Sequence, residues 1–146
     1  MKLSIVVPCY NEEQNIPLIL NRFGEIIERD DIEVILVDNG STDDSALVLA
    51  ALLPKYAFAR TVRVEVNQGY GYGILQGLKE CKGEYIGWTH ADMQTDPGDI
   101  LKALTIIEQE QGLVFVKGNR KGRPLFDVFF TAGMSLFETV YLHTKL

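Results

Sequence analysis

EVILVDNGSTDDSALVLAALL, residues 33–53, contains the pattern that decides the fold. Residues 33–38 form an apolar run, which predicts a buried strand. Turn-forming residues follow at 39–44, and residues 45–53 are typical of a helix that ends before Pro54. A continuous apolar strand that leads directly into a helix indicates a parallel sheet with both faces covered.

The same alternation of strand and helix continues through most of the chain. Strands are predicted at 3–7, 33–38, 61–66, 84–89 and 113–118, and helices at 16–27, 45–53, 74–81 and 97–111. This order predicts an α/β fold: a three-layer α/β/α sandwich with Rossmann-like topology and a mostly parallel sheet. Ligands bind beyond the carboxyl ends of the strands in such sheets, so the loops that follow the strands are the segments to inspect.

Composition narrows the class of protein. The chain has 146 residues, of which 47% are hydrophobic and 23% charged, and this balance is typical of one soluble globular domain. The net charge of -6 argues against a nucleic-acid partner. The absence of a secretory signal or a long apolar run predicts a cytoplasmic protein without a membrane span.

The C-terminal part has a different character. Residues 125–142 are strongly apolar and aromatic, and they follow a basic cluster. The cluster consists of Lys117, Arg120, Lys121 and Arg123. Two interpretations stay open: a core or edge helix, or an amphipathic helix in peripheral contact with the inner face of a membrane. We expect one catalytic domain over 1–123 and an apolar helix over 124–146.

Acidic residues concentrate where predicted strands end. Asp43 or Asp44 can cap the helix that begins at Ser45, and Asp96 can cap the next helix. Asp38 and Asp92 each end a buried strand, where a carboxylate needs solvent, a donor or a cation.

Around Asp92, residues His90, Gln94 and Asp96 stand at alternate positions, which would place their side chains on one side of an extended segment. Oxygen ligands at such a site favour Mg²⁺ or Mn²⁺.

The glycines of NQGYGYGILQG, residues 67–77, do not meet the G-x-G-x-x-G spacing of a dinucleotide-binding turn, and they follow the third predicted strand. A dinucleotide-dependent oxidoreductase is therefore disfavoured. These glycines instead predict a tight loop and close packing of the helix that follows.

Five segments together resemble the successive blocks of family 2 glycosyltransferases with the GT-A fold. They are VVPCYNEEQNI, VDNGSTDDS, NQGYGYGILQGL, GEYIGWTHADMQTDP and VKGNR, and the resemblance covers residues 3 to 123. The A-D-M-Q-x-D-P and V-x-G-x-R patterns are most similar to enzymes that glycosylate polyprenyl phosphates, the dolichyl-phosphate mannose synthase group.

The resemblance implies a nucleotide-sugar pocket with Asp92 as its central, catalytic residue. The residues that it assigns to donor binding are Pro8, Tyr10, Glu12, Asp38, Ser41, Asp92 and Arg120. Asp38 would accept a hydrogen bond from the base, and Arg120 would hold a phosphate. Mg²⁺ or Mn²⁺ would be bound by Asp92 and Gln94 and would neutralise the diphosphate leaving group.

The implied reaction is inverting transfer of a hexose from a UDP- or GDP-sugar to a polyprenyl phosphate or a cell-envelope glycan. A hydroxyl acceptor needs a carboxylate base, and none is evident after Pro97 because Glu108 and Glu110 fall in a predicted helix. An ionised phosphate acceptor needs no such base. The alternative is a truncated nucleotide-sugar-binding module without turnover, or a subunit completed by homo-oligomerisation.

His90 is the clearest departure from the family pattern, because it stands where relatives usually carry the first acid of an Asp-x-Asp pair. Three roles stay open: a ligand for a softer metal, a sign of weakened metal binding, or a hydrogen-bond partner for the ribose or a phosphate of the donor. We favour the hydrogen-bonding role, because one carboxylate and phosphate oxygens can hold Mg²⁺.

Overall fold

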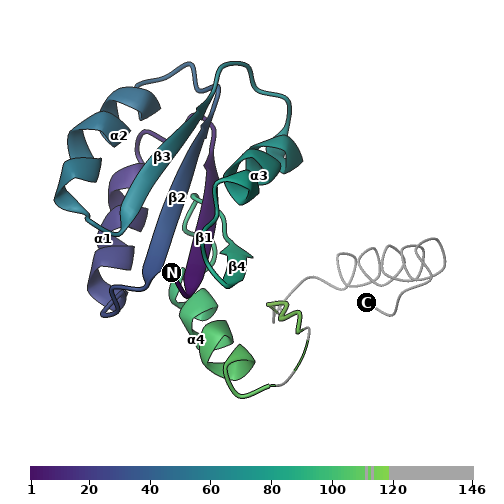
Figure 1. Cartoon of the computed structure of the whole chain (residues 1–146). Coiled ribbons are helices and arrows are strands. Elements are labelled where there is room, and N and C mark those ends of the chain that lie inside the picture. Colours follow the sequence, from purple (N-terminus) through teal and green to yellow (C-terminus); the bar gives the residue numbers. More distant parts are fainter. Residues whose placement is uncertain (111, 113, 119–146) are drawn as a thin grey trace, which may run out of the picture. The chain divides into compact units, whose positions relative to one another are not determined.

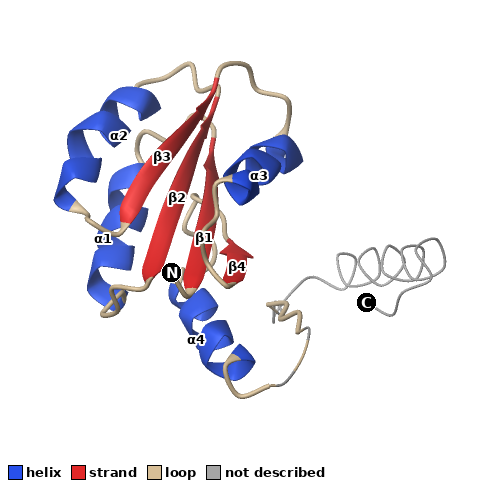
Figure 2. Ribbon diagram, viewed as in Figure 1, coloured by secondary structure: helices blue, strands red, loops and turns tan. Residues whose placement is uncertain are grey.

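Strands and helices alternate along the chain in the order expected from the sequence (Figures 1 and 2). The computed structural model describes residues 1–110, 112 and 114–118, and Met1–Val114 form one compact unit. The elements are β1 (Leu3–Cys9), α1 (Ile16–Ile26), β2 (Ile32–Asn39), α2 (Ser45–Leu52), the 3₁₀ helix η1 (Leu53–Lys55), β3 (Ala59–Val64), α3 (Tyr70–Lys79), β4 (Tyr85–Trp88) and α4 (Gly98–Ile107).

The strands form a parallel sheet in the order β3-β2-β1-β4. The chain therefore runs outward from β1 through β2 to β3, and it then returns to add β4 on the other side of β1. This reversal creates a topological switch point between the carboxyl ends of β1 and β4, where ligands bind in open parallel sheets.

Helices cover both faces of the sheet, which confirms the predicted α/β/α sandwich (Figure 2). On one face, Ile5 and Val7 belong to a core that also includes side chains of α1, α2 and α4. On the other face, Val6, Ile35 and Val37 pack with residues of α3. Every residue of β1 and β2 is buried, and this explains their continuous apolar sequences.

Helix α3 packs unusually close to the sheet because of Gly77. A Cβ atom at this position would overlap the side chain of Val6 and lie 2.8 Å from Cγ2 of Val37. The predicted close packing is therefore confirmed. The predicted helix start at residue 74 is wrong, because α3 begins at Tyr70. Glycine disfavours helix locally, but contact with the sheet outweighs that preference here.

Two strand predictions also need correction. β3 covers residues 59–64 rather than 61–66. In the segment predicted as a strand over 113–118, residues 114–118 form no regular secondary structure, and residue 113 lies outside the described residues. Strand propensity is realised only beside a partner strand, and the described sheet provides none beyond β4. The predicted domain boundary at 123 and the apolar segment 124–146 also lie outside the described residues.

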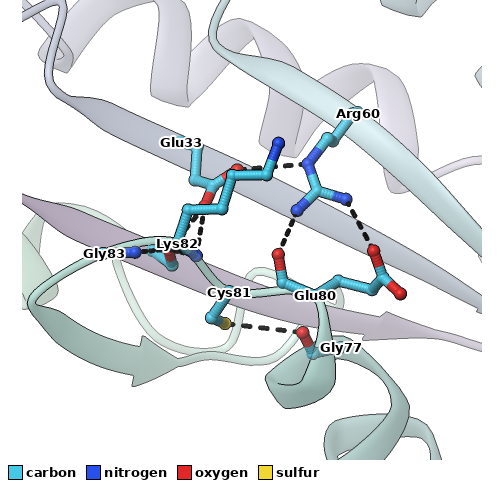
Figure 3. A network of polar contacts seen from close by, with 8 residues as sticks. Glu33, Arg60, Gly77, Glu80, Cys81, Lys82 and Gly83 are labelled. Atoms are coloured by element: carbon cyan, nitrogen blue, oxygen red, sulfur yellow. Dashed lines mark hydrogen bonds and ion pairs between the residues drawn. The ribbon is translucent and has the colours of Figure 1, made fainter. Parts of the chain in front are cut away.

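A buried polar network joins the strands near their amino ends (Figure 3). Glu33 of β2 is 6% exposed and accepts hydrogen bonds from Ser4 Oγ at 2.6 Å, the backbone N–H of Lys82 at 2.9 Å and Arg60 Nε at 3.1 Å. Arg60 also bonds to the backbone carbonyl and carboxylate of Glu80. Burial acts to raise the pKa of Glu33, but these donors outweigh it and the pKa is lowered. The network ties the loop before β4 to three strands.

Within the described part of the chain, no helix combines the length and the hydropathy needed to cross a membrane.

Candidate functional site

A cavity of about 330 Å³ lies at the switch point of the sheet. Its lining residues come from the ends of β1, β2 and β4 and from the start of α3. They are Pro8, Cys9, Tyr10, Glu12, Asn39, Asn67, Gly69, Tyr70, His90, Ala91 and Asp92. The volume is in the range of small-molecule sites, which runs from about 300 to 1,000 Å³. Of the residues predicted to bind the donor, Pro8, Tyr10, Glu12 and Asp92 are thus brought together.

The loop after β1 is fastened to the loop after β2 by side-chain hydrogen bonds. Asn11 has a positive φ of 56°, and its Oδ1 accepts from the backbone N–H of Thr42 at 2.9 Å. The backbone N–H of Asn11 donates to Ser41 Oγ at 3.1 Å, and that of Glu12 donates to Ser45 Oγ at 2.9 Å. Ser41 therefore supports the wall of the cavity from behind rather than lining it.

Asp43 performs the capping role that the sequence left open between Asp43 and Asp44. Its carboxylate accepts from the backbone N–H of Ser45 at 3.0 Å and from that of Glu13 at 3.2 Å. Burial acts to raise the pKa of Asp43, but hydrogen bonds from the side chain and backbone of Ser45 and from the backbone of Glu13 lower it on balance. Glu13 in turn accepts from the backbone N–H of Asp44 at 3.0 Å, so the acids of both loops hold the loops together.

Asp38 is buried behind the cavity. Its Oδ1 accepts from the backbone N–H of Ser41 at 3.0 Å, and its Oδ2 accepts from Arg63 Nη1 at 2.6 Å. The side chain is 3% exposed and does not line the cavity. Arg63 was missed from the sequence, because only the register of β3 against β2 places it opposite Asp38.

Four polar residues of the segment after β4 point to different places. His90 and Asp92 line the cavity, whereas Gln94 is exposed and does not. Asp96 accepts from the backbone N–H of Gly98, the first residue of α4, at 3.0 Å, which confirms its predicted capping role. The expected alternation in an extended segment is wrong, because β4 ends at Trp88 and the chain bends over residues 91–95.

Asp96 is further held by the guanidinium of Arg22, with Nε to Oδ1 at 3.1 Å and Nη2 to Oδ2 at 2.9 Å. The hydrogen bonds from Arg22 are the main reason that the pKa of Asp96 is lowered to about 2. The Asp96 carboxylate therefore connects α1, through Arg22, to the start of α4.

His90 forms a pair with Tyr70, which the sequence did not reveal as a site residue. The two rings are stacked, with centroids 5.2 Å apart and planes inclined by 9°. The Tyr70 hydroxyl and His90 Nδ1 are 3.2 Å apart. Burial, and then the nearby charge of Asp92, raises the pKa of Tyr70, so its hydroxyl stays protonated.

Asn39, also missed from the sequence, links the cavity to the start of α3. Its Nδ2 donates to the backbone carbonyl of Gly69 at 3.0 Å. Its Oδ1 is buried and accepts no hydrogen bond from any described residue. A buried acceptor without a donor is costly, and a donor from a bound molecule would remove that cost.

Cys9 also lines the cavity, but its thiol is unreactive. The buried thiol donates to the backbone carbonyl of Val7 at 3.4 Å, and burial raises its pKa. Cys9 therefore stays a thiol and contributes packing.

The described residues are consistent with a divalent ion that is bound jointly by the protein and by a bound substrate. They contain no group of three or more His, Cys, Asp or Glu side chains that could enclose a metal. Asp92 uses Oδ1 to accept from the backbone N–H of Gln94 at 3.1 Å, which leaves Oδ2 for a cation. Mg²⁺ is usually bound by one or two carboxylates together with substrate phosphates, and this donor set fits that pattern. Arg120, the predicted phosphate clamp, lies outside the described residues.

Comparison with curated proteins points to one group of enzymes. The chain is 36% identical over 124 residues to the undecaprenyl-phosphate 4-deoxy-4-formamido-L-arabinose transferase of Pseudomonas savastanoi pv. phaseolicola, a match that covers 82% of this chain and 36% of that protein. The corresponding protein of Pseudomonas fluorescens strain Pf0-1 is 37% identical over 130 residues, with 84% of this chain and 37% of that protein covered. The chain thus spans little more than a third of these relatives.

Solved structures support the same relationship. S. aureus TarS in complex with UDP-GlcNAc matches with a TM-score of 0.65 and 27% identity, over 75% of this chain and 32% of that chain. The mannosyltransferase PcManGT from Pyrobaculum calidifontis, in complex with GDP-Man and Mn²⁺, matches with a TM-score of 0.56 and 28% identity, over 62% and 27% of the two chains.

The family model for glycosyl transferase family 2 matches residues 4–133, which include all of the described strands and helices except the first residue of β1. The sheet order and the flanking helices are those expected of the Rossmann-like GT-A fold. The chain belongs to glycosyl transferase family 2.

Proposed function

We propose that this chain is the donor-binding part of an inverting glycosyltransferase that moves a hexose from a UDP- or GDP-sugar to a polyprenyl phosphate. The observation that carries the proposal is the cavity at the switch point of the sheet, lined by Tyr10, Glu12 and Asp92. The relatives named as undecaprenyl-phosphate transferases support the acceptor, and the matched structures with UDP-GlcNAc and GDP-Man support the class of donor.

The nucleotide lies against the wall made by Pro8, Tyr10 and Glu12 in this proposal. The hydrogen bonds between the loops after β1 and β2 fix that wall before the ligand binds, so little order is lost on binding. Asp38 accepts a hydrogen bond from the base, and Ser41 holds the loop that positions Asp38. Asp38 already accepts a hydrogen bond from Arg63. To bind the base, it must either accept a second hydrogen bond or give up the one from Arg63.

Catalysis requires the sugar–phosphate bond to break as the acceptor oxygen attacks the opposite face of the sugar. Asp92, together with Gln94, would hold Mg²⁺ or Mn²⁺, and such an ion would supply positive charge that stabilises the diphosphate leaving group. Arg120 contacts a phosphate. A phosphate acceptor is already ionised at neutral pH, so the proposed reaction needs no general base from the chain.

The acceptor is held at a membrane face in this proposal. The basic cluster 117–123 attracts anionic headgroups, and the apolar segment 125–142 contacts the bilayer peripherally from the cytoplasmic side. A cell-envelope glycan is the other acceptor class.

A second candidate function is a nucleotide-sugar-binding module in which the same cavity holds the donor without turnover.

The first experiment measures thermal stabilisation of the 146-residue chain by UDP, GDP and CDP, with Mn²⁺ and with EDTA. Stabilisation by one of the first two nucleotides, enhanced by Mn²⁺, supports donor binding. No stabilisation by any nucleotide would overturn both candidate functions.

The second experiment incubates the chain with Mn²⁺, UDP- or GDP-sugars and vesicles that contain undecaprenyl phosphate. A glycosylated lipid product, absent with Asp92→Asn, supports the transferase. Donor binding without any product favours the module without turnover.

A further inference from the structure

We propose that Tyr70 orients His90 so that His90 Nε2–H donates a hydrogen bond to a phosphate oxygen of the bound nucleotide. The proposal rests on the proposed function, since it assigns a contact to the donor in the same cavity. It concerns the residue at which this chain departs from the Asp-x-Asp pattern.

The contacts of His90 leave one ring nitrogen for a ligand. Its imidazole lines the cavity, and the hydroxyl of Tyr70 lies 3.2 Å from Nδ1. No described residue bonds to Nε2. The stacked ring of Tyr70 limits rotation of the imidazole, so the position of Nε2 is set by the protein rather than by the ligand.

The chemistry of the pair decides what Nε2 offers. An imidazole nitrogen is a stronger acceptor than a phenol oxygen, so the protonated hydroxyl of Tyr70 donates to Nδ1. In neutral imidazole the proton then resides on Nε2. Nε2 is also a donor in the imidazolium form, in which both ring nitrogens carry protons. Both states present an N–H toward a ligand.

The surroundings of the cavity make such a donor useful. Among the described residues, its lining includes the carboxylates of Glu12 and Asp92 and no Lys or Arg. A second carboxylate at position 90 would present only acceptors, which suit sugar hydroxyls and repel phosphate oxygens. A His donor instead suits a phosphate oxygen, and a hydrogen bond to a charged acceptor is stronger than one between neutral groups.

Tyr70 is held in place by the chain before it. The backbone N–H of Gly69 donates to Asn67 Oδ1 at 2.7 Å, and the Gly69 carbonyl accepts from Asn39 Nδ2 at 3.0 Å. Gly69 has a φ of 97°, a conformation that favours glycine. The turn therefore delivers Tyr70 to His90 before any ligand binds, and such preorganisation keeps the cost of binding low.

The test compares the affinities of uridine, UMP and UDP, or of the guanosine series if GDP is preferred, in EDTA so that no metal contributes. His90→Asn removes the Nε2 position, whereas His90→Gln keeps an amide N–H near it. We expect His90→Asn to weaken binding of the diphosphate by about tenfold and of the nucleoside hardly at all, with most of the loss restored in His90→Gln. Tyr70→Phe, which keeps the stacked ring, should give a smaller loss confined to the phosphorylated ligands.

Equal losses for nucleoside and diphosphate in His90→Asn, or no loss at all, would overturn the assignment while the proposed function stands. A wild-type chain that binds none of these ligands would overturn the proposed function and this contact with it. Circular dichroism and the thermal midpoint of each variant show whether it is folded when its affinity is measured.

Discussion

Asp92 and His90 are the two polar residues that the end of β4 delivers to the cavity. They are separated by Ala91, which is buried and belongs to the same core as α1 and α4. Ala91 also lines the cavity, so three successive residues border it. At the residue scale, the proposed metal contact depends on Oδ2 of Asp92 and the proposed phosphate contact on Nε2 of His90.

Asp92→Asn tests the proposed metal site. An amide keeps the size of the side chain but lacks the charge that a divalent ion requires. We expect the extra thermal stabilisation that Mn²⁺ gives to the nucleotide complex to disappear, while metal-free binding persists. Differential scanning fluorimetry with and without Mn²⁺ measures both quantities.

Asp99→Asn is the matched control for Asp92→Asn. Asp99 is an exposed carboxylate of α4 that bonds to Lys102 and does not line the cavity. The metal effect should be unchanged in this variant. An unchanged Mn²⁺ effect in Asp92→Asn would remove Asp92 from the proposed metal site.

Asp38→Asn separates base recognition from loop support. The variant loses the ion pair with Arg63, so the folded state should be destabilised by about 2 kcal/mol whatever the ligand does. If Asp38 also accepts from the base, uridine or guanosine affinity should fall in EDTA, measured on folded protein by calorimetry.

Arg63→Gln is the comparison variant, because it breaks the same pair and keeps the carboxylate. It should retain more base affinity than Asp38→Asn. Equal nucleoside affinity in the wild type and Asp38→Asn would leave Asp38 with the loop-supporting role alone.

At the scale of elements, α3 links the far face of the sheet to the cavity. Gly73 and Gly77 allow the helix to approach the sheet, and its first residue, Tyr70, lines the cavity. The position of Tyr70 is therefore coupled to the packing of Gly77, about two turns further along the same helix.

Gly77→Ala should destabilise the fold by about 1–3 kcal/mol, since the added methyl group overlaps Val6 and Val37 and forces the helix away from the sheet. Gly71→Ala is the matched control in the same helix. No atom lies within 4 Å of a Cβ at Gly71, so helix propensity alone should make this variant more stable by about 0.5–1 kcal/mol. Urea unfolding followed by circular dichroism gives both values, and equal effects at the two positions would contradict the packing argument.

At the scale of the whole molecule, hydrogen bonds of polar side chains hold loops and strands together at both ends of the sheet. The acids at the carboxyl ends hold loops around the cavity, whereas the network of Glu33 ties the amino ends together (Figure 3). Arg60 brings β3 into this network, and the backbone of Lys82 brings in the loop before β4. The edge strand β4 is thereby anchored next to β1.

Glu33→Gln should lower the free energy of unfolding by about 2 kcal/mol near pH 7, because two hydrogen bonds and an ion pair lose a charged acceptor. The pKa of Glu33 is lowered in the folded state, so its contribution is present above the unfolded pKa of about 4.3 and is lost as pH falls through the folded pKa. The difference between variant and wild type should therefore shrink as the pH falls below the unfolded pKa of about 4.3. Urea midpoints across this pH range measure it, and a constant difference would show that the charge of Glu33 is not the cause.

Much of the fold was predictable because β1 and β2 are buried on both faces and are therefore apolar at most positions. Helix α3 was only partly predictable, since its glycines are unfavourable locally and are explained by contact with Val6 and Asn39 across the chain. The segment 113–118 has a strand-like sequence, but residues 114–118 form no strand.

The residues of the candidate site also divide into those that the sequence predicted and those that depend on the placement of distant elements. Tyr10, Glu12 and Asp92 follow strands directly and were predictable, whereas Tyr70 and Asn39 enter the cavity from elements whose placement depends on the whole sheet.

The sequence by itself determined the alternation of strands and helices, the edge of the sheet that carries the polar loops, and membership of the family, because each of these depends on local pattern. Only the tertiary structure decided which polar residues meet. Asp38 meets Arg63 through strand register, and His90 meets Tyr70 through the turn that begins α3. Contacts between residues far apart in the chain arise from packing and register, and local sequence does not encode them one by one.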